Sequence, residues 1–307
     1  MGRTYKGRIL LTGKNGQVGW DLQRALAPLG EVVALGRQEL DLADPGAVRR
    51  SVREVRPGLI VNGGAYTAVD RAEAEPALAM AVNGIAPGIL AEEAREVGAA
   101  LIHYSTDYVF DGTKPGAYSE EDEPSPLNVY GKTKLAGERA IQAVGVPHLI
   151  FRTSWIYGLR GNNFLMTVLR LAMERDELRV VNDQRGSPTW SRSVAEATAK
   201  ILARTSFSLD RKGGLYHLSA GGETTWFGFA SAILARVGRD RGRLARLTPI
   251  PSHDYPTPAR RPTNSLLSNT KLQQAFGITL PYWEEPLDLL LGKPNHLIGH
   301  AVLGHPG

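Results

Sequence analysis

The chain of 307 residues contains no cysteine, which excludes disulfide bonds, thiol nucleophiles and metal sites built on cysteine. It also lacks an apolar run of the about 18 residues that a membrane span requires. The longest candidate, 76–91, is interrupted by Asn83, Gly84 and Pro87. No apolar signal segment precedes the first strand-like run at 8–12. We therefore expect a cytoplasmic protein that does not cross a membrane.

Charge and composition exclude further classes of protein. Hydrophobic residues make up 42% of the chain and charged ones 22%, while 34 glycines and 19 prolines are too few for a fibrous or low-complexity chain. The net charge of +5 permits binding to nucleic acid. The one basic cluster lies in a glycine-interrupted stretch without aromatic residues and consists of Arg236, Arg239, Arg241, Arg243 and Arg246. We interpret it as a solvated loop rather than a phosphate-binding patch, and expect no nucleic-acid partner.

Short apolar runs alternate with amphipathic segments through the first half of the chain. Runs typical of buried strands occupy 8–12, 31–35, 59–62, 100–106 and 148–153. Segments with helical periodicity occupy 20–27, 45–55, 77–97 and 129–144. Repeated βαβ units predict an α/β fold, a Rossmann-like doubly wound parallel sheet.

The pattern changes after about residue 155, where glycine and asparagine turns, single helices and a proline-rich tract at 249–258 follow one another. We expect residues 1–155 to form a Rossmann domain, with a returning segment near 186–205. Residues 156–307 are expected to form mainly a smaller, interleaved substrate-binding lobe. The tail at 292–307 has no clear period, and we assign no role to it.

A glycine-rich turn follows the first strand. Gly13, Gly16 and Gly19 are spaced G-x-x-G-x-x-G where a helix begins, which is the context of a dinucleotide-binding turn, although a simple strand-to-helix turn has the same spacing. At the end of the second strand, a site specific for NAD would carry a carboxylate, but the chain has Gly36 and Arg37. Arg37 can pair with a 2′-phosphate or can be an exposed loop arginine. NADPH is therefore favoured, NADH stays possible, and the domain at 1–155 is expected to be NADP(H)-binding.

Tyr130 and Lys134 lie one helical turn apart, so both side chains lie on one face. Tyrosine has a pKa of about 10 and becomes useful in proton transfer near neutral pH when a cation such as Lys134 favours its phenolate. Thr106 and Asp107 lie at the carboxyl end of a predicted central strand, at the edge where ligands bind in doubly wound folds. A hydroxyl there can hydrogen-bond a substrate carbonyl oxygen as it gains charge. These residues predict a reductase site.

The turn, the Thr-Tyr-Lys trio and the two-lobed length resemble the extended short-chain dehydrogenase/reductases. Longer segments are similar to motifs of one subfamily, the dTDP-4-dehydrorhamnose reductases. These segments are 16–20, 65–73, 103–110, 126–138, 151–155, 161–164, 182–184 and 255–265. The resemblance covers about residues 8 to 290.

The resemblance implies a role for each matching residue. Gly16, Gln17 and Val18 would line the cofactor pyrophosphate, Asp41 and Leu42 would flank adenine, and Ala65, Tyr66, Thr67 and Tyr104 would lie along the cofactor. Thr106, Tyr130 and Lys134 would be catalytic, with Asp107, Trp155, Arg261 and Asn264 at the sugar nucleotide. Trp155 can equally be core. Arg261 and Asn264 lie on a proline-rich loop, which argues against simple packing.

Some members of the subfamily use acidic residues to hold Mg²⁺ at a dimer interface. This chain has Asp21 near the first such position but Arg192 where a second carboxylate would align. We therefore predict no metal site, and expect a monomer or a homodimer.

The expected reaction is reduction of the C4 ketone of dTDP-4-dehydro-β-L-rhamnose by NADPH, giving dTDP-L-rhamnose for polysaccharide synthesis. Tyr130 would protonate the C4 oxygen, Lys134 would lower the pKa of Tyr130 and hold the nicotinamide ribose, and Thr106 would hydrogen-bond the reacting oxygen. Two alternatives stay open. One is a nucleotide-sugar epimerase or dehydratase of the same fold, for which Asp107 would be the acid-base group. The other is a non-catalytic regulatory subunit that binds a partner enzyme.

Overall fold

A six-stranded parallel sheet lies at the centre of the computed structural model, which describes residues 7–209, 212–237 and 244–291. The strand order is β10-β5-β4-β3-β1-β2. The strands are β1 (Arg8–Thr12), β2 (Glu31–Leu35), β3 (Leu59–Asn62), β4 (Ala100–Thr106), β5 (His148–Thr153) and β10 (Gly214–His217). The predicted fold class is confirmed, because the order reverses between β1 and β3 as in a doubly wound sheet.

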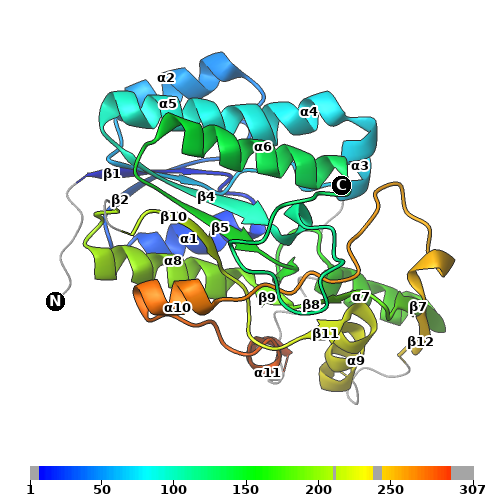
Figure 1. The fold of residues 1–307 in the computed structure, drawn as a ribbon. Helices are drawn as coiled ribbons and strands as arrows, with labels where there is room; N and C mark the ends of the chain where they lie inside the picture. The colour runs from blue at the N-terminus through cyan, green and yellow to red at the C-terminus, as the bar shows by residue number, and fades with distance from the viewer. Residues whose placement is uncertain (1–6, 210–211, 238–243, 292–307) are drawn as a thin grey trace.

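Helices cover both faces of this sheet (Figure 1). One layer holds α1 (Gln17–Leu26), α8 (Ser191–Thr205) and α10 (Thr270–Phe276). The other holds α2 (Pro45–Val55), α5 (Ala86–Val97) and α6 (Val129–Val144), with α3 (Val69–Ala74) and α4 (Pro76–Met80) before α5. Within the described ranges, no helix is long and apolar enough to span a bilayer.

Five strands and two helices have the bounds that the sequence predicts. Capping explains the two helices: the Asp44 side chain accepts from the first backbone N–H groups of α2, and Asn128 does the same for α6. Gly145 ends α6 in the left-handed conformation, with φ of 73°. Helix α1 begins at Gln17 rather than at residue 20, directly after the glycine turn.

The predicted single helix at 77–97 is wrong in its middle. The chain forms α4, then a π-helical turn at Ala81–Ile85, then α5. Pro87 lacks an N–H and cannot continue an α-helical ladder, which is why the helix changes its hydrogen bonding just before it. The turn brings Asn83 against α6, where a Cβ at Gly137 would lie 2.2 Å from the Asn83 carbonyl oxygen.

A second core lies beyond β5. Tyr157, Leu165, Phe229, Ile233 and Trp283 are buried together there. The elements around it are β6 (Ile156–Tyr157), α7 (Phe164–Glu174), β7 (Glu177–Val181), β8 (Arg185–Gly186), β9 (Thr189–Trp190), β11 (Thr224–Thr225), α9 (Trp226–Val237), β12 (Arg246–Ile250) and α11 (Glu284–Leu291). Between these elements the chain returns to the sheet twice, as α8 against α1 and as β10 beside β5.

Part of the predicted basic cluster, Arg239, Arg241 and Arg243, and the tail at 292–307 lie outside the described residues. The two cluster members at the borders are paired: Arg236 with Asp288 at 2.7 Å and Arg246 with Glu177 at 2.9 Å.

Candidate active site

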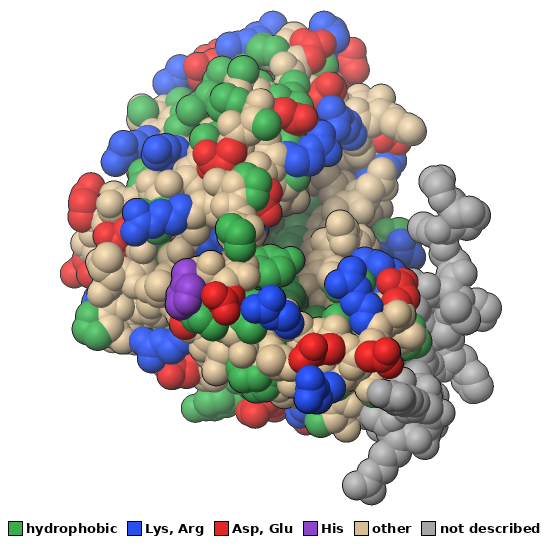
Figure 2. Space-filling model, turned by 90° about the vertical axis from the view of Figure 1, so that its right-hand side faces the viewer, with side chains coloured by type: hydrophobic (Ala, Val, Ile, Leu, Met, Phe, Trp, Pro, Cys, Tyr) green, Lys and Arg blue, Asp and Glu red, His purple; other side chains and the backbone are tan. Residues whose placement is uncertain are grey.

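The carboxyl ends of β1, β3 and β4 meet at one edge of the sheet, and the predicted site residues gather along it. Figure 2 looks onto this side of the molecule and shows a hollow with Lys, Arg, Asp and Glu side chains around it. The strands bring these residues together because they are parallel, so all of them end at the same edge.

The glycine turn after β1 has no room for side chains. A Cβ at Gly13, which has φ of 71°, would lie 2.6 Å from the backbone of Gly64, and a Cβ at Gly19 would lie 2.0 Å from the Gly13 carbonyl oxygen. Gly16 donates its N–H to Gly13 and precedes the first residues of α1, Gln17 and Val18. Gly16 is exposed and no side chain caps α1, so the first N–H groups of the helix are available to an anionic group.

The end of β2 carries a carboxylate that the sequence analysis missed. Arg37 is exposed, as expected, but Glu39 accepts from the Gly36 N–H at 2.9 Å and from Lys14 Nζ at 2.5 Å. The bond from Lys14 lowers the pKa of Glu39. Glu39 was missed because it lies four residues beyond the strand and is brought back by the turn. The turn after β2 thus carries Lys14 and Glu39 in addition to Arg37, the one charged residue expected there.

The residues expected along the cofactor differ in exposure. Asp41, Ala65 and Thr67 are exposed, and Leu42 is buried with its Cδ1 against the Gly64 turn. Tyr66 is fixed through its backbone, because the Asn83 amide bonds both its N–H and its carbonyl oxygen at 2.9 Å.

Tyr104 is buried and faces away from α6. Its hydroxyl bonds Thr198 Oγ1 of α8 at 2.8 Å, so that its backbone carbonyl rather than its ring faces α6. That carbonyl accepts from Lys134 Nζ at 2.5 Å.

The structure brings Thr106 and Tyr130 together and places Lys134 one turn further along α6. Burial raises the pKa of Tyr130 to about 12, an effect that the Thr106 hydroxyl opposes by hydrogen bonding. Burial lowers the pKa of Lys134 to about 8, and the charge of Glu138 opposes this. Helix α6 can approach so closely because Gly131 lacks a side chain: a Cβ there would lie 2.1 Å from the Tyr108 carbonyl oxygen.

Asp107 lies in the same group and is 3% exposed. Its carboxylate accepts from Thr106 Oγ1 at 2.9 Å and from Ser154 Oγ at 3.2 Å. Burial raises its pKa to about 6, although these hydrogen bonds favour the charged form. The carboxyl group beside Thr106 is therefore half protonated near pH 6, well above the range of an ordinary aspartate.

Trp155 is held in a strained and crowded position. Its φ of 48° is unusual for a bulky residue, and its ring stacks on Trp226 with centroids 3.5 Å apart. A Cβ at Gly186 would lie 2.3 Å from the ring. Through Trp226 the ring lies beside the second core, and strain of this kind clusters at functional sites.

Arg261 and Asn264 are engaged by other parts of the protein. The Arg261 guanidinium bonds both carboxylate oxygens of Asp70, at 2.8 and 3.1 Å. The buried Asn264 amide donates to the carbonyl oxygens of Lys114 and Gly116. The structure thus assigns the Asn264 side chain to the backbone of a neighbouring loop.

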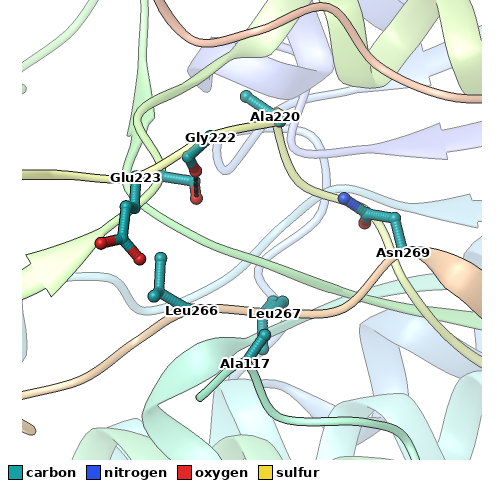
Figure 3. Close-up of a pocket in the computed structure, with 9 residues that line it drawn as sticks. Ala117, Ala220, Gly222, Glu223, Leu266, Leu267 and Asn269 are labelled. Atoms are coloured by element: carbon teal, nitrogen blue, oxygen red, sulfur yellow. Dashed lines mark hydrogen bonds between the residues drawn. The ribbon is translucent and has the colours of Figure 1, made fainter. Parts of the chain in front are cut away.

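A separate pocket of about 310 Å³ lies near the end of β10 (Figure 3). Glu223 and Asn269 line it on opposite sides, but the Asn269 amide is bonded to Ser219. None of the predicted site residues lines this pocket.

The residues at the two positions considered for a metal, Asp21 and Arg192, have other partners. Asp21 accepts from Ser191 Oγ at 2.6 Å, and Arg192 pairs with Glu196 at 2.7 Å. Across the residues that the structure describes, no group of three His, Cys, Asp or Glu side chains could hold a metal ion.

Comparison with known proteins gives a family and close relatives. Residues 7–294 match the family described as the RmlD substrate binding domain. The chain is 50% identical over 289 residues to dTDP-4-dehydrorhamnose reductase of Burkholderia thailandensis, covering 92% of this chain and 97% of that protein. It is 48% identical over 291 residues to the Escherichia coli K12 enzyme of the same name, covering 93% and 97%.

Solved structures similar to this chain include enzymes with the same name as these relatives. A dTDP-4-dehydrorhamnose reductase from Bacillus anthracis in complex with NADP has a TM-score of 0.86 at 37% identity, covering 93% of this chain and 98% of that one. A Thermus thermophilus UDP-glucose 4-epimerase complex with NAD has a TM-score of 0.78 at 21% identity, covering 97% and 100%, and shares the fold.

Proposed function

The chain belongs to the RmlD family of dTDP-4-dehydrorhamnose reductases, and we infer that it reduces the C4 ketone of dTDP-4-dehydro-β-L-rhamnose with NADPH to give dTDP-L-rhamnose. The family resemblance stated from the motifs is confirmed. The protein is an NADP-dependent oxidoreductase. The observation that carries the chemistry is the meeting of Thr106, Tyr130 and Asp107 at the end of β4.

The glycine turn fits a dinucleotide cofactor. The turn packs tightly at Gly13, Gly19 and Gly64, where a Cβ would collide, while Gly16 is exposed and the N-terminus of α1 has no side-chain cap. Gly16, Gln17 and Val18 would hold the pyrophosphate, while Arg37 and Lys14 would meet the 2′-phosphate. When bound, NADPH supplies the hydride for the reaction.

The roles of the protein's own residues follow from their protonation. A ketone that accepts hydride at carbon gains negative charge on oxygen, and a proton donor must meet it. Tyr130 is held protonated near neutral pH by its burial, so it can donate its phenolic proton to that oxygen. Thr106 would hydrogen-bond the same oxygen as its charge develops. Lys134 would stabilise the tyrosinate that remains.

The direct test supplies the 4-keto-6-deoxy sugar nucleotide with NADPH and follows loss of the reduced-nicotinamide absorbance. Turnover supports the reductase. The absorbance spectrum of the purified protein separates it from an epimerase or dehydratase, since those enzymes retain NAD⁺ through their cycle. The raised pKa of Asp107 is the observation that favours this second candidate, because an acid-base carboxyl group beside the threonine would serve it. Absence of turnover with NADPH still bound would support a non-catalytic subunit.

We also propose that Arg261 meets the substrate diphosphate and that Trp155 lies beside the apolar side of the deoxysugar. Because Asp70 pairs with Arg261, two variants are needed to separate binding from bracing of the loop. Arg261→Ala should weaken the sugar-nucleotide Kd by roughly 2 to 5 kcal/mol and leave NADPH binding unchanged. Asp70→Asn removes the brace but keeps the guanidinium, so it should lower Tm without that loss of affinity. Equal effects of both variants on Tm and on both affinities would show that Arg261 is only a brace.

For assembly, we propose a monomer or a homodimer without a metal bridge. The support is local: Asp21 is bound by Ser191, and Arg192 brings positive charge where a bridge would need a carboxylate. Sedimentation velocity with Mg²⁺ and with a chelator should give the same molecular mass.

A further inference from the structure

A row of buried polar side chains crosses the middle of the sheet and ends at Lys134. It begins at the Gly64 N–H, which donates to Thr12 Oγ1 at 3.2 Å, and Thr12 in turn donates to Asn62 Oδ1 at 2.6 Å. Asn62 Nδ2 lies 3.0 Å from His103 Nδ1, and His103 Nε2 lies 3.2 Å from Lys134 Nζ.

Thr12, Asn62, His103 and Lys134 are each 1% exposed, so the protein alone satisfies their hydrogen bonds. Strands β1, β3 and β4 each place one member side by side in the sheet, since Thr12 is in register with Asn62 and Asn62 with His103. The row connects the cofactor turn to the catalytic helix.

The hydrogen bonds of this row all run from donor to acceptor in an order that the contacts fix. Thr12 accepts from a backbone N–H, so its own hydroxyl proton goes to Asn62 Oδ1. This fixes the Asn62 amide with its Nδ2–H₂ toward His103, and His103 Nδ1 must therefore accept. Burial holds the pKa of His103 well below its usual value, so the ring is neutral and carries its single proton on Nε2. That N–H points at Lys134 Nζ.

We propose that His103 is a positioning residue for the reduction, whose Nε2–H holds Lys134 Nζ against the Tyr104 carbonyl and opposes the addition of a proton to the amine. The amine form of Lys134 can accept from His103 Nε2–H, whereas the ammonium form presents only donors to it. The ammonium form is therefore stabilised by the Tyr104 carbonyl oxygen and destabilised by the His103 Nε2–H. This inference rests on the proposed function, in which Lys134 stabilises the tyrosinate of Tyr130.

The other groups that face Lys134 act in the opposite direction or are already neutralised. Glu138, one turn further along α6, favours the ammonium form. Arg152 of β5 binds Glu138 through two nitrogens, at 2.7 and 3.0 Å, and Ser105 of β4 donates to the same carboxylate. His103 is thus the group from the sheet that disfavours the charge, and its effect adds to that of burial.

The first test reads the tautomer in the wild-type protein. Two described imidazoles are buried and should stay neutral from about pH 5 to 9: His103, and His217, whose Nδ1 lies 3.1 Å from the Tyr118 carbonyl oxygen. In ¹⁵N-histidine spectra, we expect one non-titrating ring with its proton on Nε2 and one with its proton on Nδ1. Two non-titrating rings with the proton on Nδ1 would overturn the proposal.

The second test uses His103→Gln, whose amide oxygen can accept from Lys134, with His217→Gln as the matched control. Turnover of the wild type is established first, so a failure of the proposed reaction is seen before any variant is compared. In His103→Gln, the basic limb of the pH profile of kcat/KM should move upward by about one pH unit, a tenfold change in proton affinity. The kcat at neutral pH should fall between about tenfold and 10²-fold, with little change in KM.

His217→Gln removes an equally buried ring that does not contact Lys134, so it should lower Tm without moving the limb. If both variants lower Tm and neither moves the limb, His103 has only a packing role and the proposal is wrong. Should His103→Gln fail to fold, the wild-type tautomer still decides the question.

Discussion

Replacing Asp107 by asparagine should stabilise the protein at high pH while impairing its activity. The carboxyl group is 3% exposed, and burial raises its pKa from 3.8 to about 6. The unfolded chain therefore loses this proton near pH 4, whereas the folded protein keeps it until about pH 6. Stability from this group is present below about pH 4 and is lost as the pH rises through 6, since the folded state binds more protons in that interval.

The magnitude follows from the two pKa values. At about 1.4 kcal/mol for each tenfold change in proton affinity, ionised Asp107 destabilises the folded state by roughly 3 kcal/mol above pH 6. Asp107→Asn keeps the shape and removes the charge. The free energy of unfolding should therefore rise by up to roughly 3 kcal/mol at pH 8 and change little at pH 4, provided that Ser154 Oγ turns to accept from the new amide.

Urea unfolding at pH 4 and pH 8 measures this difference. Asp111→Asn is the control with the opposite sign, because hydrogen bonds led by that of the Thr113 N–H lower the pKa of Asp111. That variant should lose stability at pH 8. An Asp107→Asn protein that is destabilised at pH 8, or that changes equally at both pH values, would show that the carboxylate is not strained by burial.

Three further predictions concern other parts of the site. Tyr130→Phe should lower kcat by about 10²- to 10⁴-fold and leave NADPH affinity nearly unchanged, and near-full turnover would refute the proton-donor role. Arg37→Asp should move the preference from NADPH toward NADH, and an unchanged ratio of kcat/KM for the two cofactors would remove Arg37 from the site. Glu138→Gln should reduce the free energy of unfolding by about 3 to 5 kcal/mol, because it leaves the buried Arg152 charge without its partner. The exposed Glu174→Gln should change stability by less than about 0.5 kcal/mol, and equal losses in urea unfolding would refute the difference.

The sheet could be predicted because four of its first five strands, β1, β3, β4 and β5, are buried almost throughout, while the edge strand β2 is half-buried but equally apolar. Such strands are continuous apolar runs bounded by polar residues, so both ends are visible in the sequence. Strand β10 was not predicted, because its four residues, Gly214–His217, contain a glycine and a histidine and show neither alternation nor a long apolar run. Its place depends on pairing with β5, a contact distant in sequence.

The site was predictable where chemistry is local. The spacing of Tyr130 and Lys134 and the glycine turn each depend on one helix or one turn. Contacts between distant segments were not predictable: Arg261 meets Asp70 across 191 residues, and His103 meets Asn62 across 41. A histidine within a buried strand has no pattern that shows which side chain lies opposite it.

Burial shifts the pKa values of two groups of the site, Tyr130 and Lys134, in directions that favour reduction. It raises the pKa of Tyr130 to about 12, so the phenol keeps its proton and serves as an acid. It lowers the pKa of Lys134 to about 8, so the amine is only partly charged near that pH. A partly charged amine stabilises the Tyr130 phenolate less, and the phenol therefore keeps its proton. The reverse reaction, oxidation of an alcohol, needs Tyr130 as a phenolate and would gain from high pH. Asn62 and His103 close the site on the side of the sheet and exclude water there. Exclusion of water disfavours both the Tyr130 phenolate and the Lys134 ammonium ion, so Tyr130 stays protonated, which is the form that reduction of a ketone requires.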